Sequence, residues 1–267
     1  MNLVPISRAD DPRLDVFRLN ERQLFPRDQR RDPAEHGLFV AEGDLVVERA
    51  FAAGCEPVAL LCSERYAESL GNAQCEVFVG DIETRREVTG LGVPLDALGV
   101  FRRPAPTEID RLLTHSRRLV ALEAVDNPTN VGSVVRSASA LGWDGLLLDW
   151  TCADPFARRA LRVAMGTSFS LAHTRAQPDT DIIDAMSRAG LTTVALTPNP
   201  EADDIRDVAQ REEIRRGRVA IILGAERTGL STRALDGSKI RVRIPMHAGV
   251  DSLNIATAAA IALFALA

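Results

Sequence analysis

The chain has 267 residues, of which 46% are hydrophobic, and it carries a formal net charge of −5. This length allows one large domain or two small ones, and the apolar fraction suffices for a sizeable core. The negative balance excludes a global basic field, so nucleic-acid binding would depend on local patches of arginine. No apolar run is long enough for a membrane span, and the N-terminal stretch lacks the apolar segment of a signal peptide.

The cysteines give no sign of a metal or redox site. They stand at positions 55, 62, 75 and 152, without a C-x-x-C pair or a Cys/His metal spacing. We therefore expect reduced thiols that behave as small apolar side chains, no bound metal and a cytoplasmic location.

The first 35 residues or so form an arm rich in Arg, Asp and Pro. The spacing of Leu14, Phe17 and Leu24 predicts a short amphipathic helix within it. The exposed arginines of this helix are either a solvated face or an edge that contacts RNA, and the sequence leaves both interpretations open.

A small α/β module is predicted to follow, up to about residue 103. The expected elements are a strand before residue 43, a helix over 43–53 ended by Gly54, strands at 57–62 and 75–81, and a closing helix and strand. Two prolines then stiffen a segment without apolar periodicity, so residues 104–118 are expected to be a linker.

From residue 119 onward, apolar strands alternate with helices. Strands are predicted at 119–125, 145–149, 192–197, 219–226 and 240–246, and helices at 131–141, 155–165 and 255–267. Near-continuous apolar strands in this alternation indicate a parallel sheet covered on both faces. Ligands of such sheets bind beyond the carboxyl ends of the strands. The loops at 126–130, 197–200, 224–229 and 245–254 are therefore expected to form one site.

The first of these loops leads into "DNPTNVGSVVRS". Asn130 is expected at the N-cap of the helix, Gly132 permits close approach of a ligand, and Arg136 can point back over the helix start. By itself the segment is equally consistent with a capped helix that carries a surface arginine.

A second motif, "LGAERTGLS", places Gly224 and Gly229 around Glu226. Two glycines around an acid predict a tight loop whose backbone faces a ligand. The order matches neither the phosphate-binding P-loop nor the dinucleotide fingerprint of Rossmann folds. The alternative is an ordinary turn in which Glu226 caps the next helix.

The third motif is the closing stretch of the chain. Residues 255–267 predict a helix that is apolar nearly all round, which suits a core helix or half of a subunit interface. Ser252 and Asn254 precede it at positions where capping is the simpler interpretation. Met246, after Ile244 and a proline, is a suitable wall for an adenine or a sulfonium ligand.

In this order the three motifs resemble the SpoU branch of the SPOUT superfamily, the RNA ribose 2′-O-methyltransferases. The resemblance covers about 119–267, and residues 1–103 resemble, less specifically, the L30e-like RNA-binding domain that often precedes it. The matching residues are Asn130, Gly132 and Arg136, then Gly224, Glu226, Gly229, Leu230 and Ser231, then Ile244, Pro245, Met246, Ser252, Leu253 and Asn254. The stretch "RRALRVAMGTSFSLA" also matches the family.

The resemblance implies a parallel sheet whose C-terminal segment threads a loop to form a trefoil knot, a rare feature that periodicity does not suggest. It implies S-adenosylmethionine as cofactor and a homodimer held by the last helix, with each site completed by the partner subunit. Cofactor contacts are expected from Leu196, Thr197, Gly224, Ile244, Met246 and Leu253. The implied catalytic residues are Asn130, Arg136, Glu226, Ser252 and Asn254.

The implied reaction is attack of a ribose 2′-hydroxyl on the sulfonium methyl group, with ribosomal RNA expected ahead of transfer RNA. The family favours Arg136 as the base, although a free guanidinium has a pKa above about 12. The alternative is a charged Arg136 that clamps a phosphate and stabilises the developing alkoxide. RNA phosphates are expected to contact Arg102, Arg103, Arg117, Arg118, Arg158, Arg159 and Arg162.

Three other functions compete with this one. A SPOUT enzyme that methylates a base would share the fold, but Asn130 and Arg136 match the ribose-methylating branch. A non-catalytic RNA-binding protein stays an alternative, which the intact polar residues of all three motifs disfavour. A Rossmann-type oxidoreductase would need the glycine fingerprint that is missing. The sequence leaves open which nucleotide is methylated and whether the role is housekeeping or antibiotic resistance.

Overall fold

The computed structural model describes residues 2–26, 37–71, 73–93, 95–247 and 250–267. The chain divides into two compact units, Met1–Ala105 with Phe156–Phe169, and Pro106–Pro155 with Ser170–Ala267. Two features differ from the expected division at 103 and 118. Residues 156–169 belong with the N-terminal unit, and the expected linker contains the helix α5 (Ile109–His115).

The N-terminal unit is built on a five-stranded mixed sheet of order β1-β4-β3-β5-β2. Its strands are β1 (Asn2–Ile6), β2 (Leu38–Glu42), β3 (Pro57–Cys62), β4 (Glu76–Gly80) and β5 (Ala97–Arg102). Strand β5 runs antiparallel to β2 and β3, whereas β1 and β3 run parallel to β4. The α/β character of this module is confirmed. Strand β1 was not predicted; it is an edge strand that tolerates Pro5 because one side of it needs no ladder partner.

Short helices cover this sheet. They are the 3-10 helix Pro12–Arg18, α1 (Glu21–Leu24), α2 (Asp44–Ala52), α3 (Glu64–Ser69), α4 (Ile82–Thr89), α7 (Arg158–Val163) and the 3-10 turn Thr167–Phe169. The single amphipathic helix predicted for the arm was wrong. Asp11 and Asn20 cap two separate short helices, and these helices bury the predicted apolar residues Leu14, Phe17 and Leu24. Residues 27–36 of the arm lie outside the described residues.

Aromatic stacking explains why residues 156–169 belong to the N-terminal unit. The Phe39 ring lies 5.2 Å from the Phe156 ring and 5.4 Å from the Phe169 ring, measured between centroids. Phe101 stacks on the same Phe39 ring at 5.4 Å. Such pairs contribute beyond the area they bury, so this mid-chain segment completes the core of the unit.

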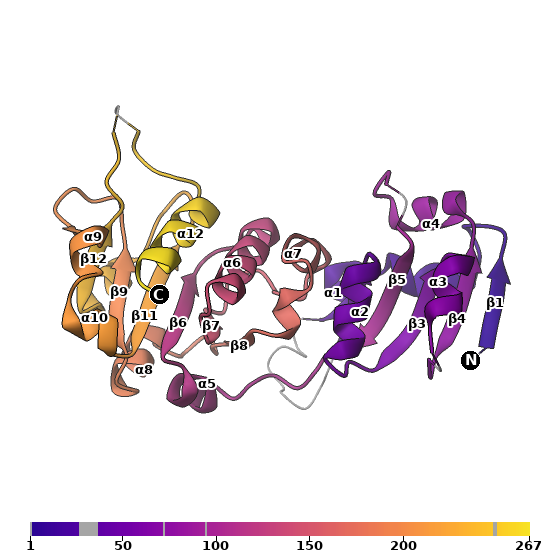
Figure 1. The fold of residues 1–267 in the computed structure, drawn as a ribbon, viewed down its shortest axis with the longest axis horizontal. Coiled ribbons are helices and arrows are strands. Elements are labelled where there is room, and N and C mark those ends of the chain that lie inside the picture. Colours follow the sequence, from indigo (N-terminus) through magenta and orange to yellow (C-terminus); the bar gives the residue numbers. More distant parts are fainter. Residues whose placement is uncertain (1, 27–36, 72, 94, 248–249) are drawn as a thin grey trace. The chain divides into compact units, whose positions relative to one another are not determined.

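The second unit contains a seven-stranded sheet of order β10-β12-β9-β11-β6-β7-β8. Its strands are β6 (Arg118–Glu123), β7 (Gly145–Leu148), β8 (Ala172–Arg175), β9 (Thr192–Leu196), β10 (Asp203–Asp204), β11 (Val219–Gly224) and β12 (Ile240–Arg243). Every pair of neighbours is parallel, which confirms the predicted parallel arrangement, although strands β8 and β10 were not predicted. Figure 1 shows these strands in magenta to yellow.

Helices cover this sheet. They are α5, α6 (Pro128–Ala140), α8 (Ile182–Arg188), α9 (Ile205–Val208), α10 (Glu212–Arg216), α11 (Thr232–Gly237) and α12 (Ile255–Ala265). Helices α5, α8 and α11 share one apolar cluster with inward residues of β6, β7, β9 and β11. Helix α12 packs against α6 and β11 (Figure 1).

The strand order places three strand ends side by side. Strand β9 lies between β11 and β12, so the loops that follow these three strands meet at one edge of the sheet. After β12 the chain returns over this edge to α12. Whether this return threads a loop as a trefoil knot stays a prediction. Within the described residues, no helix has the length and apolarity needed to cross a lipid bilayer.

Candidate functional site

A cavity of about 460 Å³ opens where the loops after β9, β11 and β12 meet. Its walls come from residues 196–198, 223–230, 235, 244, 246, 251–253, 255 and 258. All six residues expected to contact a cofactor line it: Leu196, Thr197, Gly224, Ile244, Met246 and Leu253. Three of the four predicted loops therefore form one site, and the loop at 126–130 does not line it.

The loop after β11 closes on itself because of its two glycines. A Cβ atom on Gly224 would lie 2.4 Å from the carbonyl carbon of Gly229, closer than two such atoms approach. Gly229 adopts a φ of +67°, and its N–H donates to the carbonyl of Ala225 at 3.0 Å. The tight loop predicted from "LGAERTGLS" is present. Glycine is required at Gly224, where the two ends of the loop touch.

Glu226 and Asn254 connect two walls of the cavity. The amide nitrogen of Asn254 donates to the Glu226 carboxylate at 2.7 Å, and its oxygen accepts the N–H of Ala256 at 2.9 Å. Asn254 thus caps α12 and holds Glu226 at once, while Glu226 and Ser252 line the cavity. The alternative in which Glu226 caps the next helix was wrong, because Ser231 caps α11 by accepting the N–H of Ala234.

The residues of the first motif lie outside the cavity. Helix α6 begins at Pro128 with Asn127 as its cap, so the prediction that Asn130 caps the helix was wrong. Proline is favoured at the first helical position, which moves the helix start three residues earlier. Asn130 is 4% exposed, and its amide nitrogen has no hydrogen-bond partner among the described residues. Arg136 is exposed on the same helix.

The model of the SpoU rRNA Methylase family matches residues 117–264. The chain belongs to this family.

Relatives of the same kind match along most of the chain. An uncharacterised tRNA/rRNA methyltransferase of Mycobacterium bovis is 34% identical over 99% of this chain and 91% of its own length. The 23S rRNA (guanosine(2553)-2′-O)-methyltransferase RlmP of Bacillus subtilis is 24% identical over 89% of this chain and 91% of its own.

Solved structures extend the similarity to both units. An rRNA methyltransferase from Sinorhizobium meliloti is 25% identical, with a TM-score of 0.80 over 100% of this chain and 98% of that one. The SpoU methyltransferase AviRb from Streptomyces viridochromogenes, solved with the cofactor AdoMet, is 25% identical, with a TM-score of 0.76 over 96% of this chain and 97% of that one.

Two arginines expected to contact RNA form hydrogen bonds to backbone carbonyls within this SpoU-family chain. The Arg118 guanidinium donates to the carbonyls of Ile214 and Gly217, both at 2.8 Å, and Arg117 donates to the carbonyl of Arg215. These bonds satisfy the carbonyls that end helix α10. A sequence pattern cannot predict these bonds, because every residue has a backbone carbonyl and the residue type does not mark the ones that accept from arginine.

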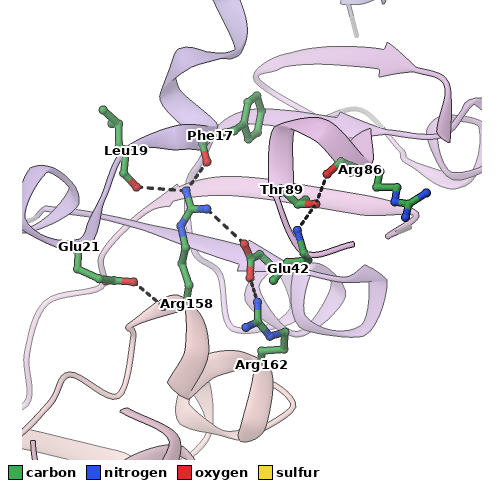
Figure 2. A network of polar contacts seen from close by, with 9 residues as sticks. Phe17, Leu19, Glu21, Glu42, Arg86, Thr89, Arg158 and Arg162 are labelled. Atoms are coloured by element: carbon green, nitrogen blue, oxygen red, sulfur yellow. Dashed lines mark hydrogen bonds and ion pairs between the residues drawn. The ribbon is translucent and has the colours of Figure 1, made fainter. Parts of the chain in front are cut away.

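Two more of these arginines converge on a buried carboxylate in the N-terminal unit (Figure 2). Arg158 and Arg162 bind the two oxygens of Glu42, whose side chain is 2% exposed. Arg158 also donates to the carbonyls of Phe17 and Leu19. Bonds to Glu42 and to two backbone carbonyls leave little of the Arg158 guanidinium free for a phosphate, whereas the Arg162 side chain is 37% exposed.

The remaining three arginines differ in exposure. Arg103 donates to the carbonyl of Leu38 and lies over the rings of Phe25 and Phe156, whereas Arg102 forms an exposed pair with Glu56. Arg159 is exposed. Arg102, Arg117 and Arg159 are exposed and Arg162 is partly so, which makes these four better placed for phosphate contacts than Arg103, Arg118 and Arg158.

Glu123 was not among the predicted site residues; it ends strand β6 and accepts two hydrogen bonds from Ser231, at the far end of the loop after β11. The available signal was an acidic residue at the end of an apolar run, and the strand predicted at 119–125 included it. Among the described residues, no cluster of three or more His, Cys, Asp and Glu side chains could hold a metal ion.

Proposed function

We propose that this chain transfers a methyl group from S-adenosylmethionine to a ribose 2′-hydroxyl in structured RNA, with ribosomal RNA ahead of transfer RNA. The observation that carries the proposal is the single cavity lined by all six expected cofactor residues together with Glu226 and Ser252. Membership of the SpoU family and the similarity to RlmP support the same reaction.

The cavity fits S-adenosylmethionine in size and chemistry. Its volume of about 460 Å³ lies within the range of small-molecule sites. The side chains of Leu196, Ile244 and Leu253 offer apolar surface for an adenine, and Met246 offers a polarisable thioether beside them. When bound, the cofactor supplies a methyl group on a positively charged sulfonium sulfur. Transfer of this methyl group leaves a neutral thioether.

The protein side chains would then position the hydroxyl and handle its proton. Glu226 and Asn254, joined at 2.7 Å, hold the β11 loop against the start of α12, and Ser252 faces the cavity beside them. We assign the buried, unpartnered amide of Asn130 to the ribose, because a buried donor without a partner marks a place for a ligand acceptor. In-line positioning is the main requirement of such a transfer.

Arg136 is the base or an electrostatic clamp in this proposal. A clamp needs only the positive charge, so Arg136→Lys should keep much of the rate at neutral pH. A base needs a neutral form, so the rate of the lysine variant should instead rise with pH as the amine loses its proton. The pH profile of the methylation rate separates the two.

The proposed site is completed by a second copy of the chain. Helix α12 exposes Phe264 at 75% and Ile261 at 39%, an apolar surface that suits a subunit interface. Arg136 lies outside the cavity of its own subunit, and we propose that it reaches the cavity of the partner. Mixing inactive Arg136→Ala and Asn254→Ala chains should restore about one quarter of the wild-type activity, since half of the dimers would hold one intact site. Failure to restore activity, with dimers intact, would contradict a shared site.

We further propose that the C-terminal segment forms the trefoil knot of the SPOUT fold and that the N-terminal unit is an L30e-like RNA-binding domain. Strand β12 pairs with β9, whereas α12 packs against α6 and β11, and this separation of two consecutive elements supports the knot. The mixed five-stranded sheet with short covering helices supports an independent domain.

Transfer of labelled methyl groups from S-adenosylmethionine tests the reaction. Ribosomal and transfer RNA fractions that lack their modifications are incubated with the wild-type chain and with Arg136→Ala, then digested with alkali. Label in an alkali-resistant dinucleotide, lost in the variant, supports ribose methylation and names the class of RNA. Label in ordinary mononucleotides would assign a base methyltransferase. No label with either RNA, from a chain that binds the cofactor, would favour a non-catalytic RNA-binding protein.

A further inference from the structure

The loop of residues 224–231, here called the cofactor loop, is tied at both ends to one residue outside the cavity. Glu123 ends β6 and pairs in register with Gly224, where the cofactor loop begins. Its carboxylate accepts the N–H of Ser231 at 2.7 Å and the hydroxyl of Ser231 at 2.8 Å, where the loop ends. We propose that Glu123 is a positioning residue that sets the shape of the cofactor loop, an inference that rests on the proposed function.

One donated and one accepted hydrogen bond fix the orientation of the Ser231 hydroxyl. Its hydroxyl donates to Glu123 and accepts the N–H of Ala234, so both its proton and a lone pair are used. A carboxylate can accept both Ser231 donors, one on each oxygen, as Glu123 does. Hydrogen bonds to a charged acceptor are stronger than those to a neutral one, so this bond pair anchors the returning end of the loop.

The backbone that carries Glu123 is fixed in turn by the next residue, Ala124. Ala124 adopts a left-handed φ of +55°, and its N–H donates to Asp149 at 2.8 Å. Asp149 also accepts the N–H groups of Thr151 and Cys152, both at 2.9 Å, and so is anchored in its own loop. A strained backbone position persists only where its surroundings hold it. The same turn leads into α6, so Glu123 couples the cofactor loop to the motif that carries Asn130.

This arrangement predicts that the cofactor affinity depends on a residue that does not touch the cavity. Glu123→Ala removes both acceptors and should weaken S-adenosylmethionine binding by about tenfold, the lower end of the range for hydrogen bonds to charged groups, because Ser231 is exposed. Glu123→Gln keeps one acceptor for the Ser231 N–H but loses the second, so its affinity should fall between those of the alanine variant and the wild type.

Calorimetric titration of the full chain with S-adenosylmethionine tests this, with urea unfolding of each variant measured alongside. Ser63→Ala is the control. Ser63 caps α3 by accepting the N–H of Tyr66, as Ser231 caps α11 by accepting that of Ala234, but Ser63 belongs to the N-terminal unit. The expected result is a graded loss of affinity in the order wild type, Glu123→Gln, Glu123→Ala, with the control unchanged. If Glu123 only stabilised the fold, its variants would unfold at lower urea concentration, but the folded chains would all bind S-adenosylmethionine with the same affinity.

Each other outcome counts against a defined claim. Equal affinities in the wild type and Glu123→Gln, with both chains folded, would overturn the role of Glu123. An equal loss of affinity in Ser63→Ala would also overturn it, because the effect would then be general destabilisation. A wild-type chain that binds no S-adenosylmethionine would overturn the proposed function and the inference with it.

Discussion

Replacing Glu42 by glutamine tests the network in which Arg158 and Arg162 share one carboxylate (Figure 2). The substitution keeps the size of the side chain but removes its charge, and it turns one acceptor toward a guanidinium into a donor. Breaking a buried ion pair costs about 3–5 kcal/mol. The Arg158 and Arg162 side chains are 19% and 37% exposed, so water partly compensates them. We therefore expect a loss of about 3 kcal/mol, at the lower end of that range.

Two optical probes can localise this loss to the N-terminal unit. Both tryptophans, Trp143 and Trp150, belong to the second unit, so tryptophan fluorescence follows that unit alone. Circular dichroism follows the helices of both units. With a urea dependence of about 1.5–3 kcal/mol per molar, Glu42→Gln should lower the midpoint of the N-terminal unit by about 1–2 M. The fluorescence midpoint should not move with it.

A matched control is available in the same unit. Glu56 pairs with Arg102 at 3.1 Å, but both side chains are more than half exposed. Glu56→Gln should cost less than about 1 kcal/mol, as exposed pairs do. If Glu42→Gln unfolds at the same urea concentration as Glu56→Gln, the buried network does not stabilise the unit. If its fluorescence midpoint falls as far as its dichroism midpoint, the network does not belong to the N-terminal unit alone.

Three further predictions follow from other positions. Ala124→Gly removes the strain of a left-handed φ, about 1–2 kcal/mol, but increases the conformational entropy of the unfolded chain, which costs about 0.4–1 kcal/mol. Urea unfolding should therefore show unchanged or slightly higher stability. Gly224→Ala should weaken S-adenosylmethionine binding about tenfold or more in calorimetry, because its Cβ would meet Gly229, whereas Gly71→Ala, in open space, should not. Burial raises the pKa of the Cys62 thiol to about 11 and also raises that of Cys152, so both should react with a disulfide reagent only slowly at pH 8 and faster as pH rises toward 11; rapid reaction of the folded chain at pH 8 would refute this.

The sequence by itself determined five of the seven strands of the second unit, their parallel arrangement and most of the cavity. Apolar runs of four to six residues identify buried parallel strands, because both faces of such a strand are covered. Parallel strands carry their ligands at their carboxyl ends, so the loops at 197–200, 224–229 and 245–254 were predictable as neighbours. The local chemistry of Gly224 and Gly229 was also predictable, since a tight loop requires it.

Only the tertiary structure decided which distant groups meet. Glu42 lies more than a hundred residues before Arg158 and Arg162, and no local pattern pairs them. The helix predicted at 155–165 was expected to cover the parallel sheet, but the stacking of Phe156 on Phe39 assigns it to the N-terminal unit. The strand predicted at 119–125 gave Glu123 no role, and only its bond to Ser231 shows that it connects β6 to the loop after β11. Periodicity reports the face that each element buries, whereas hydrogen bonds between loops depend on positions that only the assembled sheet defines.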